Sequence, residues 1–183
     1  AIETLGARLA DGVLRACAGA TAFDGQDDRE VRLRIAEHRI PLRDDLPSVD
    51  ELSEALGDTD HPFTVWRAAS MLNVIGRTDL DGEKQDRRIY RGESFVFGSP
   101  EWCIVGLPAE SFVASQIGIR ALSPAEGTLV GAYFDCDLWY IPSREAYAVG
   151  AYETDQGWSY VARGASERIA ESTLALIPRG DRY

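Results

Sequence analysis

The chain has few of the residues that most often form disulfides, bind metals or act as nucleophiles. Its 183 residues include three cysteines, two histidines, one lysine and one asparagine. Cys17, Cys103 and Cys136 lie far apart without a CxxC pair, which excludes a zinc ribbon and a thioredoxin-type motif. Their odd number argues against a closed set of disulfides. We expect all three to be reduced and buried as small apolar side chains.

Recognisable catalytic motifs are also missing. The histidines, His38 and His61, have no nearby serine or cysteine that would indicate a nucleophile. The chain contains no GxSxG, HExxH, Walker-type loop or GxGxxG after a strand. We therefore predict no catalytic residues, no metal and no cofactor, and a protein that is not an enzyme. The alternative is an enzyme that uses carboxylates such as Asp135 and Asp137, or Glu101, as acid and base.

Two acidic segments could suggest calcium, but their spacing favours turns and loops. In residues 79–83, Asp-Leu-Asp-Gly-Glu, the glycine follows the second aspartate directly, unlike the glycine of an EF-hand loop. We interpret this segment as a turn. Residues 24–30 hold three aspartates and Glu30, and a solvated loop is the more common structure for such a run.

Long apolar runs are absent as well. No stretch approaches eighteen apolar residues, and the beginning of the chain lacks a basic segment followed by an uninterrupted apolar one. We predict no signal peptide and no transmembrane span, and hence a cytoplasmic protein. Of nineteen basic residues one is lysine and the other eighteen are arginine, a bias that suggests a GC-rich bacterial genome.

Acidic residues outnumber basic ones, thirty to nineteen, for a net charge of −11. A negative field repels phosphate backbones and anionic lipid surfaces, so nucleic acid and membranes are poor partners. A basic protein is favoured, because opposite charge steers encounter and raises the association rate. Acidity that simply keeps the protein in solution is the alternative interpretation.

The first 76 residues predict a mainly helical segment. Apolar residues at spacings of three and four predict an amphipathic helix over 2–18. Residues 31–40 alternate as a strand would, with a helix as the alternative. Ser48 with Glu51 forms a capping box for a helix to about Leu56, and Pro62 suits the first turn of another helix up to Gly76.

After Asp79 the apolar runs become shorter, more aromatic and more β-branched, which predicts strands separated by turns. The expected strands are 88–90, 94–97, 102–106, 112–122, 128–134, 138–141, 146–152 and 158–161. A closing amphipathic helix begins near Ser166 and ends before Pro178. The fold class is α+β: a helical N-terminal part, a mostly antiparallel sheet and a C-terminal helix, in one domain over residues 1–183.

The densest aromatic region of the sequence is interleaved with carboxylates. Alternation along strands sends about half of these rings into the core and leaves the rest on an exposed sheet face. Rigid rings supply contact area and carboxylates steer a basic partner. The predicted partner-binding residues are Asp135, Asp137, Trp139, Tyr140, Tyr152, Asp155 and Trp158.

Several short motifs of the second half follow one another in a familiar order. They are Val105-Gly106-Leu107-Pro108, a strand over 112–122, Leu129-Val130-Gly131, a hairpin over 137–147 and the final amphipathic helix. Over about residues 100–178 the chain resembles the SUKH superfamily, which is abundant among bacterial immunity proteins. The resemblance implies an α+β fold with a mostly antiparallel sheet, no enzymatic activity, and the binding and neutralisation of a cognate toxin.

These observations lead to three hypotheses. The first is a non-enzymatic cytosolic binding protein, most specifically a toxin-neutralising immunity protein that covers an active site with an acidic, aromatic sheet face. The second is a secretion or folding chaperone, which would dimerise and expose an apolar groove. The third is the carboxylate-using enzyme.

Overall fold

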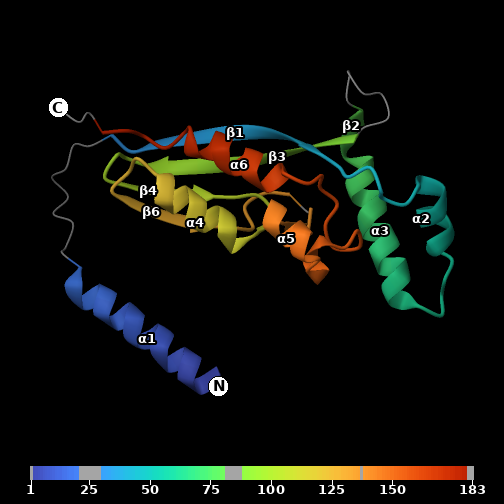
Figure 1. The fold of residues 1–183 in the computed structure, drawn as a ribbon, viewed down its shortest axis with the longest axis horizontal. Coiled ribbons are helices and arrows are strands. Elements are labelled where there is room, and N and C mark those ends of the chain that lie inside the picture. The colour runs from blue at the N-terminus through green and yellow to red at the C-terminus, as the bar shows by residue number, and fades with distance from the viewer. Residues whose placement is uncertain (1, 21–29, 81–87, 137, 181–183) are drawn as a thin grey trace. The chain divides into compact units, whose positions relative to one another are not determined.

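A computed structural model describes residues 2–20, 30–80, 88–136 and 138–180 (Figure 1). The chain divides into two compact units, Ala1–Glu30 and Val31–Tyr183. The first unit contains helix α1 (Ile2–Gly19), which confirms the amphipathic helix expected there. Asp137 and the three aspartates of residues 24–28 lie outside the described residues.

Two helices follow the first strand of the second unit. Helix α2 (Val49–Ala55) begins with the predicted capping box: the Ser48 hydroxyl accepts the backbone N–H of Glu51, and the Glu51 carboxylate accepts the backbone N–H of Ser48. Helix α3 (Pro62–Gly76) has its proline in the first turn, where the missing N–H costs no hydrogen bond. Both predictions are confirmed.

A five-stranded mixed sheet forms the centre of this unit. Strands β1 (Arg32–Pro41) and β3 (Arg88–Gly98) are antiparallel along ten residue pairs, and β2 (Thr78–Leu80) pairs with the start of β3. Strand β4 (Trp102–Gly106) is antiparallel to β3, whereas β6 (Gly127–Gly131) is parallel to β4. The sheet is therefore mostly antiparallel, as predicted. The two strands expected over 88–97 are one continuous strand.

The strand predicted over residues 112–122 is wrong, because Val113–Leu122 forms helix α4. Its β-branched residues favoured a strand, but Ser115 and Ile119, four positions apart, are buried on one side of a helix. The helix crosses between β4 and β6, and this crossover allows these two strands to be parallel.

The strand predicted over residues 146–152 is also wrong. Arg144–Val149 forms helix α5, whose cap Ser143 accepts the N–H of Ala146 and whose end is Gly150 at a φ of 77°. A serine cap and a C-terminal glycine were visible in the sequence. The remaining late strands are short: β5 (Glu110–Ser111) and β7 (Tyr140–Ile141) have two residues each. A 3₁₀ helix, η1 (Tyr152–Thr154), follows α5, and residues 158–161 make isolated bridges.

The closing helix α6 (Ala165–Leu174) confirms the last predicted element. It packs beside α4 and against β1 and β3, so these two helices cover one face of the sheet (Figure 1). The core between them includes the fully buried Val96, Val105 and Ile119. The buried His38 of β1 bridges to the hydroxyls of Ser94 and Ser172, at 2.8 Å and 3.1 Å.

The opposite face of the sheet carries a row of exposed apolar side chains. Leu33 of β1 pairs with Phe97 of β3, Phe97 with Ile104 of β4, and Ile104 with Leu129 of β6. Of the residues predicted to bind a partner, those that the structure describes lie outside this sheet: Tyr140 is in β7, Tyr152 is in η1, and the others are outside helices and strands.

Candidate functional site

Seven aromatic rings from four parts of the chain form one connected group, here called the ring cluster. Trp66 of α3 lies 5.1 Å from Trp139 between ring centroids, and Trp139 lies 5.7 Å from Trp158. Tyr152 of η1 extends the group from Trp158, at 6.1 Å, to Tyr140 of β7, at 5.9 Å. Its members are Phe63, Trp66, Phe112, Trp139, Tyr140, Tyr152 and Trp158. Most contacts are edge-to-face or tilted, the geometries that aromatic pairs prefer.

Backbone hydrogen bonds hold the segments of the cluster in register. Ala109 donates its N–H to Asp135 and accepts the N–H of Tyr133. Glu110 donates its N–H to the carbonyl of Trp139, and Tyr140 donates to that of Trp158. Strands β5 and β7 are parallel, with Glu110 opposite Tyr140. Backbone hydrogen bonds therefore join the segment that follows β4 to the segment that follows β6.

The backbone around this site is strained. The five non-glycine residues with positive φ are Ala109, Tyr133, Asp135, Cys136 and Trp139, at 50° to 65°, in the described part of the chain. Each such residue costs about 1–2 kcal/mol. Conformations of this kind persist where surrounding contacts fix them, and they concentrate at functional sites. The strain marks residues 133–136 and Trp139 as positions whose conformation the fold maintains.

A carboxylate and three tyrosine hydroxyls meet beside the rings. The hydroxyls of Tyr140 and Tyr152 lie 2.9 Å apart. This hydrogen bond, with burial and the nearby Glu110 carboxylate, raises the pKa of Tyr140 above its usual range. A hydrogen bond to Glu110 is likewise the main cause that raises the pKa of Tyr133. The Glu110 carboxylate therefore contributes to the raised pKa of both tyrosines.

A pocket of about 370 Å³ opens between α3 and the strained segment. Its walls include the indoles of Trp66 and Trp139, and Glu110 and Tyr133 lie at one side. Ser70, Asn73, Ala109 and Cys136 complete the lining. We call this the aromatic pocket. Its volume matches a side chain or a small ligand fragment, near the lower end of ligand-binding pockets.

The structure brings together four of the seven residues predicted from the sequence: Trp139, Tyr140, Tyr152 and Trp158. Asp155 lies at the edge of the cluster, where its carboxylate is 3.5 Å from Arg67 and accepts the N–H of Gly157. Asp135 is exposed, but its side chain accepts the backbone N–H of Glu93 and so serves β3. Asp137 lies outside the described residues.

Sequence reasoning missed Phe63, Trp66, Glu110, Phe112 and Tyr133 as members of one site. Phe63 and Trp66 belong to α3, far from the aromatic segment in sequence, and they are 54% and 42% exposed. Glu110 belongs to a two-residue strand that no periodicity reveals. No local sequence signal links Glu110 to the aromatic segment, because the contact arises from the pairing of β5 with β7.

Within residues 2–20, 30–80, 88–136 and 138–180, no group of three or more histidine, cysteine, aspartate or glutamate side chains could hold a metal ion. In the same residues, no helix has both the length and the apolar character that crossing a membrane requires.

No protein-family model matches the chain, and no curated protein matches it. Among solved structures, a neutral ceramidase from Pseudomonas aeruginosa is similar with a TM-score of 0.43 and 16% sequence identity. The match covers 86% of this chain and 31% of the ceramidase chain, so the chain spans about a third of that protein's length. The resemblance to the SUKH superfamily stays a prediction.

Proposed function

We propose that this chain is a binding protein that holds a positively charged group of a basic protein partner in the aromatic pocket. The strained residues that line the pocket carry the proposal. Ala109, Tyr133, Cys136 and Trp139 all border it with φ between 50° and 65°. A fold that maintains this strain around an open, ring-lined pocket favours a site built for a ligand.

The chemistry of the lining favours a cation as the bound group. The faces of tryptophan and tyrosine rings attract guanidinium and ammonium groups within about 6 Å, and a carboxylate adds a charge-assisted hydrogen bond. The ring cluster already shows such a contact, with the Arg67 guanidinium 5.9 Å from the ring of Phe63. The net charge of −11 would draw a basic partner toward the site.

The most specific form of this proposal is a cytoplasmic immunity protein that neutralises a cognate toxin. Toxins that act on nucleic acid are basic, and an arginine or lysine of such an enzyme would suit the pocket. The acidic charge and the resemblance to the SUKH superfamily support this form. A non-enzymatic role follows from it.

The test is a pull-down from native cytosol, read by mass spectrometry at two salt concentrations. Three forms serve as bait: the wild-type chain, a Glu110→Gln and Trp139→Ala double variant, and a Trp102→Ala control. Trp102 is an exposed tryptophan on β4 that does not line the pocket. We expect the wild type and the control to capture one basic protein that the double variant loses.

Raised salt should weaken the capture, because exposed charges are screened. Equal capture by all three baits would contradict the proposal. A captured protein that is acidic, or whose binding is insensitive to salt, would also contradict it.

A second candidate function, the carboxylate-using enzyme, is favoured by a different observation. Glu110, Tyr140 and Tyr152 place a carboxylate and two hydrogen-bonded phenols at one site. Groups with perturbed pKa values beside a pocket are candidates for proton transfer. Of the pair first considered for this role, Asp135 is exposed and accepts the backbone N–H of Glu93, and Asp137 lies outside the described residues.

The two functions are separated by Tyr152→Phe. This change removes one hydroxyl and keeps the ring, so a binding site loses little while an acid–base site loses activity. A screen of ester, amide and phosphate substrates with the wild type, Tyr152→Phe and Tyr147→Phe gives the answer. If the wild type and Tyr147→Phe turn over a substrate and Tyr152→Phe does not, the result would favour the enzyme.

A further inference from the structure

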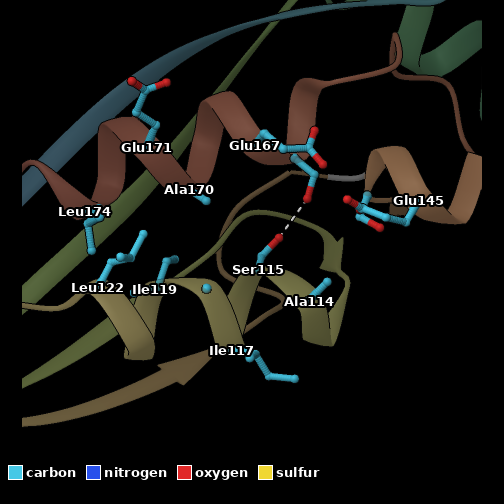
Figure 2. Close-up of a pocket in the computed structure, with 13 residues that line it drawn as sticks. Ala114, Ser115, Ile117, Ile119, Leu122, Glu145, Glu167, Ala170, Glu171 and Leu174 are labelled. Atoms are coloured by element: carbon cyan, nitrogen blue, oxygen red, sulfur yellow. Dashed lines mark hydrogen bonds between the residues drawn. The ribbon is translucent and has the colours of Figure 1, made fainter.

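A second concave surface lies between helices α4 and α6, on the covered side of the sheet. It is a groove of about 570 Å³, and it shares no residue with the aromatic pocket. Figure 2 shows Ile119 and Leu122 of α4 pointing toward Ala170 and Leu174 of α6. Leu122 is 70% exposed, so a large alkyl side chain is left in solvent at the mouth of the groove.

The two helices are joined at one end of the groove by a hydrogen bond between serine side chains. The hydroxyls of Ser115 and Ser166 are joined at 2.7 Å across that end, as Figure 2 shows. Both serines are buried. The small residues Ala114, Gly118 and Ala170 also line the groove and leave room for another backbone to approach, and Glu171 of α6 adds a carboxylate to the same wall. The groove is thus apolar and closed at one end by a satisfied polar contact.

Carboxylates border the closed end of the groove. Glu145 of α5 and Glu167 of α6 both line it. One oxygen of Glu167 accepts the backbone N–H of Arg144 at 2.9 Å. Its other oxygen, Oε2, is buried without a hydrogen bond in the described structure, since Nε of Arg144 is 3.6 Å away. Within the described residues no ion pair includes Glu145.

We infer that this groove binds an amphipathic helix of a partner chain, with alkyl side chains between Leu122 and Leu174 and an arginine or lysine at the Glu145–Glu167 end. The walls α4 and α6 have ten residues each, about 15 Å, which matches three turns of a docked helix. Such a helix would present anchors at positions i, i+3 or i+4, and i+7. Its cation would lie near the Glu145 carboxylate, for which the described residues show no ion pair.

Binding of a helix in the groove does not depend on the function proposed for the aromatic pocket. The floor holds alkyl side chains and no aromatic ring, so a flat cationic group has no stacking partner there. Alkyl anchors with a basic residue at one end therefore fit better than a basic residue alone. The groove would thus be a second surface, separate from the aromatic pocket, on which this chain contacts a protein partner.

The test selects binders from a display library of randomised 16-residue helical peptides on the full chain, with counter-selection on Leu122→Asp. We expect enriched sequences with alkyl residues at i, i+4 and i+7 and a lysine or arginine near one end. A synthetic peptide of that sequence should bind the Leu122→Asp variant at least about tenfold more weakly, because a buried leucine contact is lost.

Glu145→Gln should weaken the same peptide by a smaller factor, about threefold. The matched control is Leu129→Glu, which places a charge at an equally exposed leucine on β6 and should leave binding unchanged. Three outcomes would overturn the inference: no enrichment after counter-selection, enriched peptides without a basic residue, or equal binding to wild type and Glu145→Gln. Circular dichroism of each variant verifies that it is folded.

Discussion

Glu110 and Tyr140 lie directly opposite each other in the parallel pair of β5 and β7. Thirty residues separate them in sequence, and neither belongs to an element longer than two residues. The pair is positioned by hydrogen bonds from the neighbouring loops, because Glu110 donates to Trp139 and Tyr140 donates to Trp158. The chemistry of the site therefore depends on loop geometry. Substitutions at the site should change the pKa values of its tyrosines.

Glu110→Gln should lower the pKa of Tyr133. The hydrogen bond to the Glu110 carboxylate is the main cause that raises this pKa, and a neutral amide stabilises the protonated phenol less. Tyrosine-selective ¹³C NMR over pH 8–12 would measure the change. Glu126→Gln, which alters an exposed carboxylate away from the pocket, is the control. An unchanged Tyr133 titration in Glu110→Gln would refute the assignment.

Tyr152→Phe should lower the pKa of Tyr140. The hydrogen bond between the two hydroxyls, 2.9 Å apart, is the largest cause of the raised value. Burial and Glu110 would still act on Tyr140, so the pKa should fall without returning to that of a free tyrosine. The same NMR method, with the titration extended to higher pH to reach the raised pKa of Tyr140, measures it, with Tyr147→Phe as the control. The prediction fails if the two variants titrate alike at Tyr140.

The free energy of unfolding should decrease as the pH falls from 7.5 to 5.5, in part because of His38. Burial lowers the pKa of His38 in the folded state, so the unfolded chain binds the proton first, below its ordinary value of about 6.5. The unfolded state is then stabilised relative to the folded one. Urea denaturation at pH 7.5, 6.5 and 5.5 should give a smaller loss for His38→Gln than for the wild type. Parallel losses in both proteins would count against this role.

Ser48→Ala should reduce the free energy of unfolding by about 1 kcal/mol, the usual effect of removing a serine N-cap. The variant loses the bond from the Glu51 N–H to the Ser48 hydroxyl, so one donor at the start of α2 has no acceptor. Ser53→Ala is the matched control. Ser53 is exposed and donates to a carbonyl of the same helix, so its change should stay within about 0.5 kcal/mol. Equal effects of both substitutions, in chemical denaturation, would be evidence against the cap.

Gly98→Ala should destabilise the protein more than Gly150→Ala. Both glycines have a φ that other residues rarely adopt, 150° and 77°. A Cβ at Gly98 would also overlap the carbonyl oxygen of Trp102 on β4, whereas nothing lies within 4 Å of one at Gly150. We expect a loss of about 1–2 kcal/mol for Gly150→Ala and a larger one for Gly98→Ala. Thermal denaturation that ranks the two in the reverse order would contradict this.

The sequence alone determined those elements whose signals lie within a few residues. The capping box at Ser48, the proline at the start of α3, the spacing of apolar residues in α1 and the α6 pattern each predict a helix from local geometry. The fold class followed from these helices and from the β-branched texture of the second half. Local rules of this kind require no knowledge of distant residues.

Tertiary packing decided the elements whose local signals were ambiguous. Residues 113–122 contain β-branched residues that suit a strand, yet they form α4, because Ser115 and Ile119 are buried as a helical pair against α6 and the sheet. Because α4 crosses between the two strands, β6 can run parallel to β4. Periodicity within the segment could not reveal a neighbour fifty residues later in the chain.

The candidate site shows the same division. Its rings and acids could be identified as residue types in the sequence, and Trp139, Tyr140, Tyr152 and Trp158 were. The contribution of α3 and of Glu110 could not be identified, because it arises from contacts between segments that lie far apart in sequence. Composition determined that the protein is acidic, and only the fold decided which rings are exposed and which surround a carboxylate.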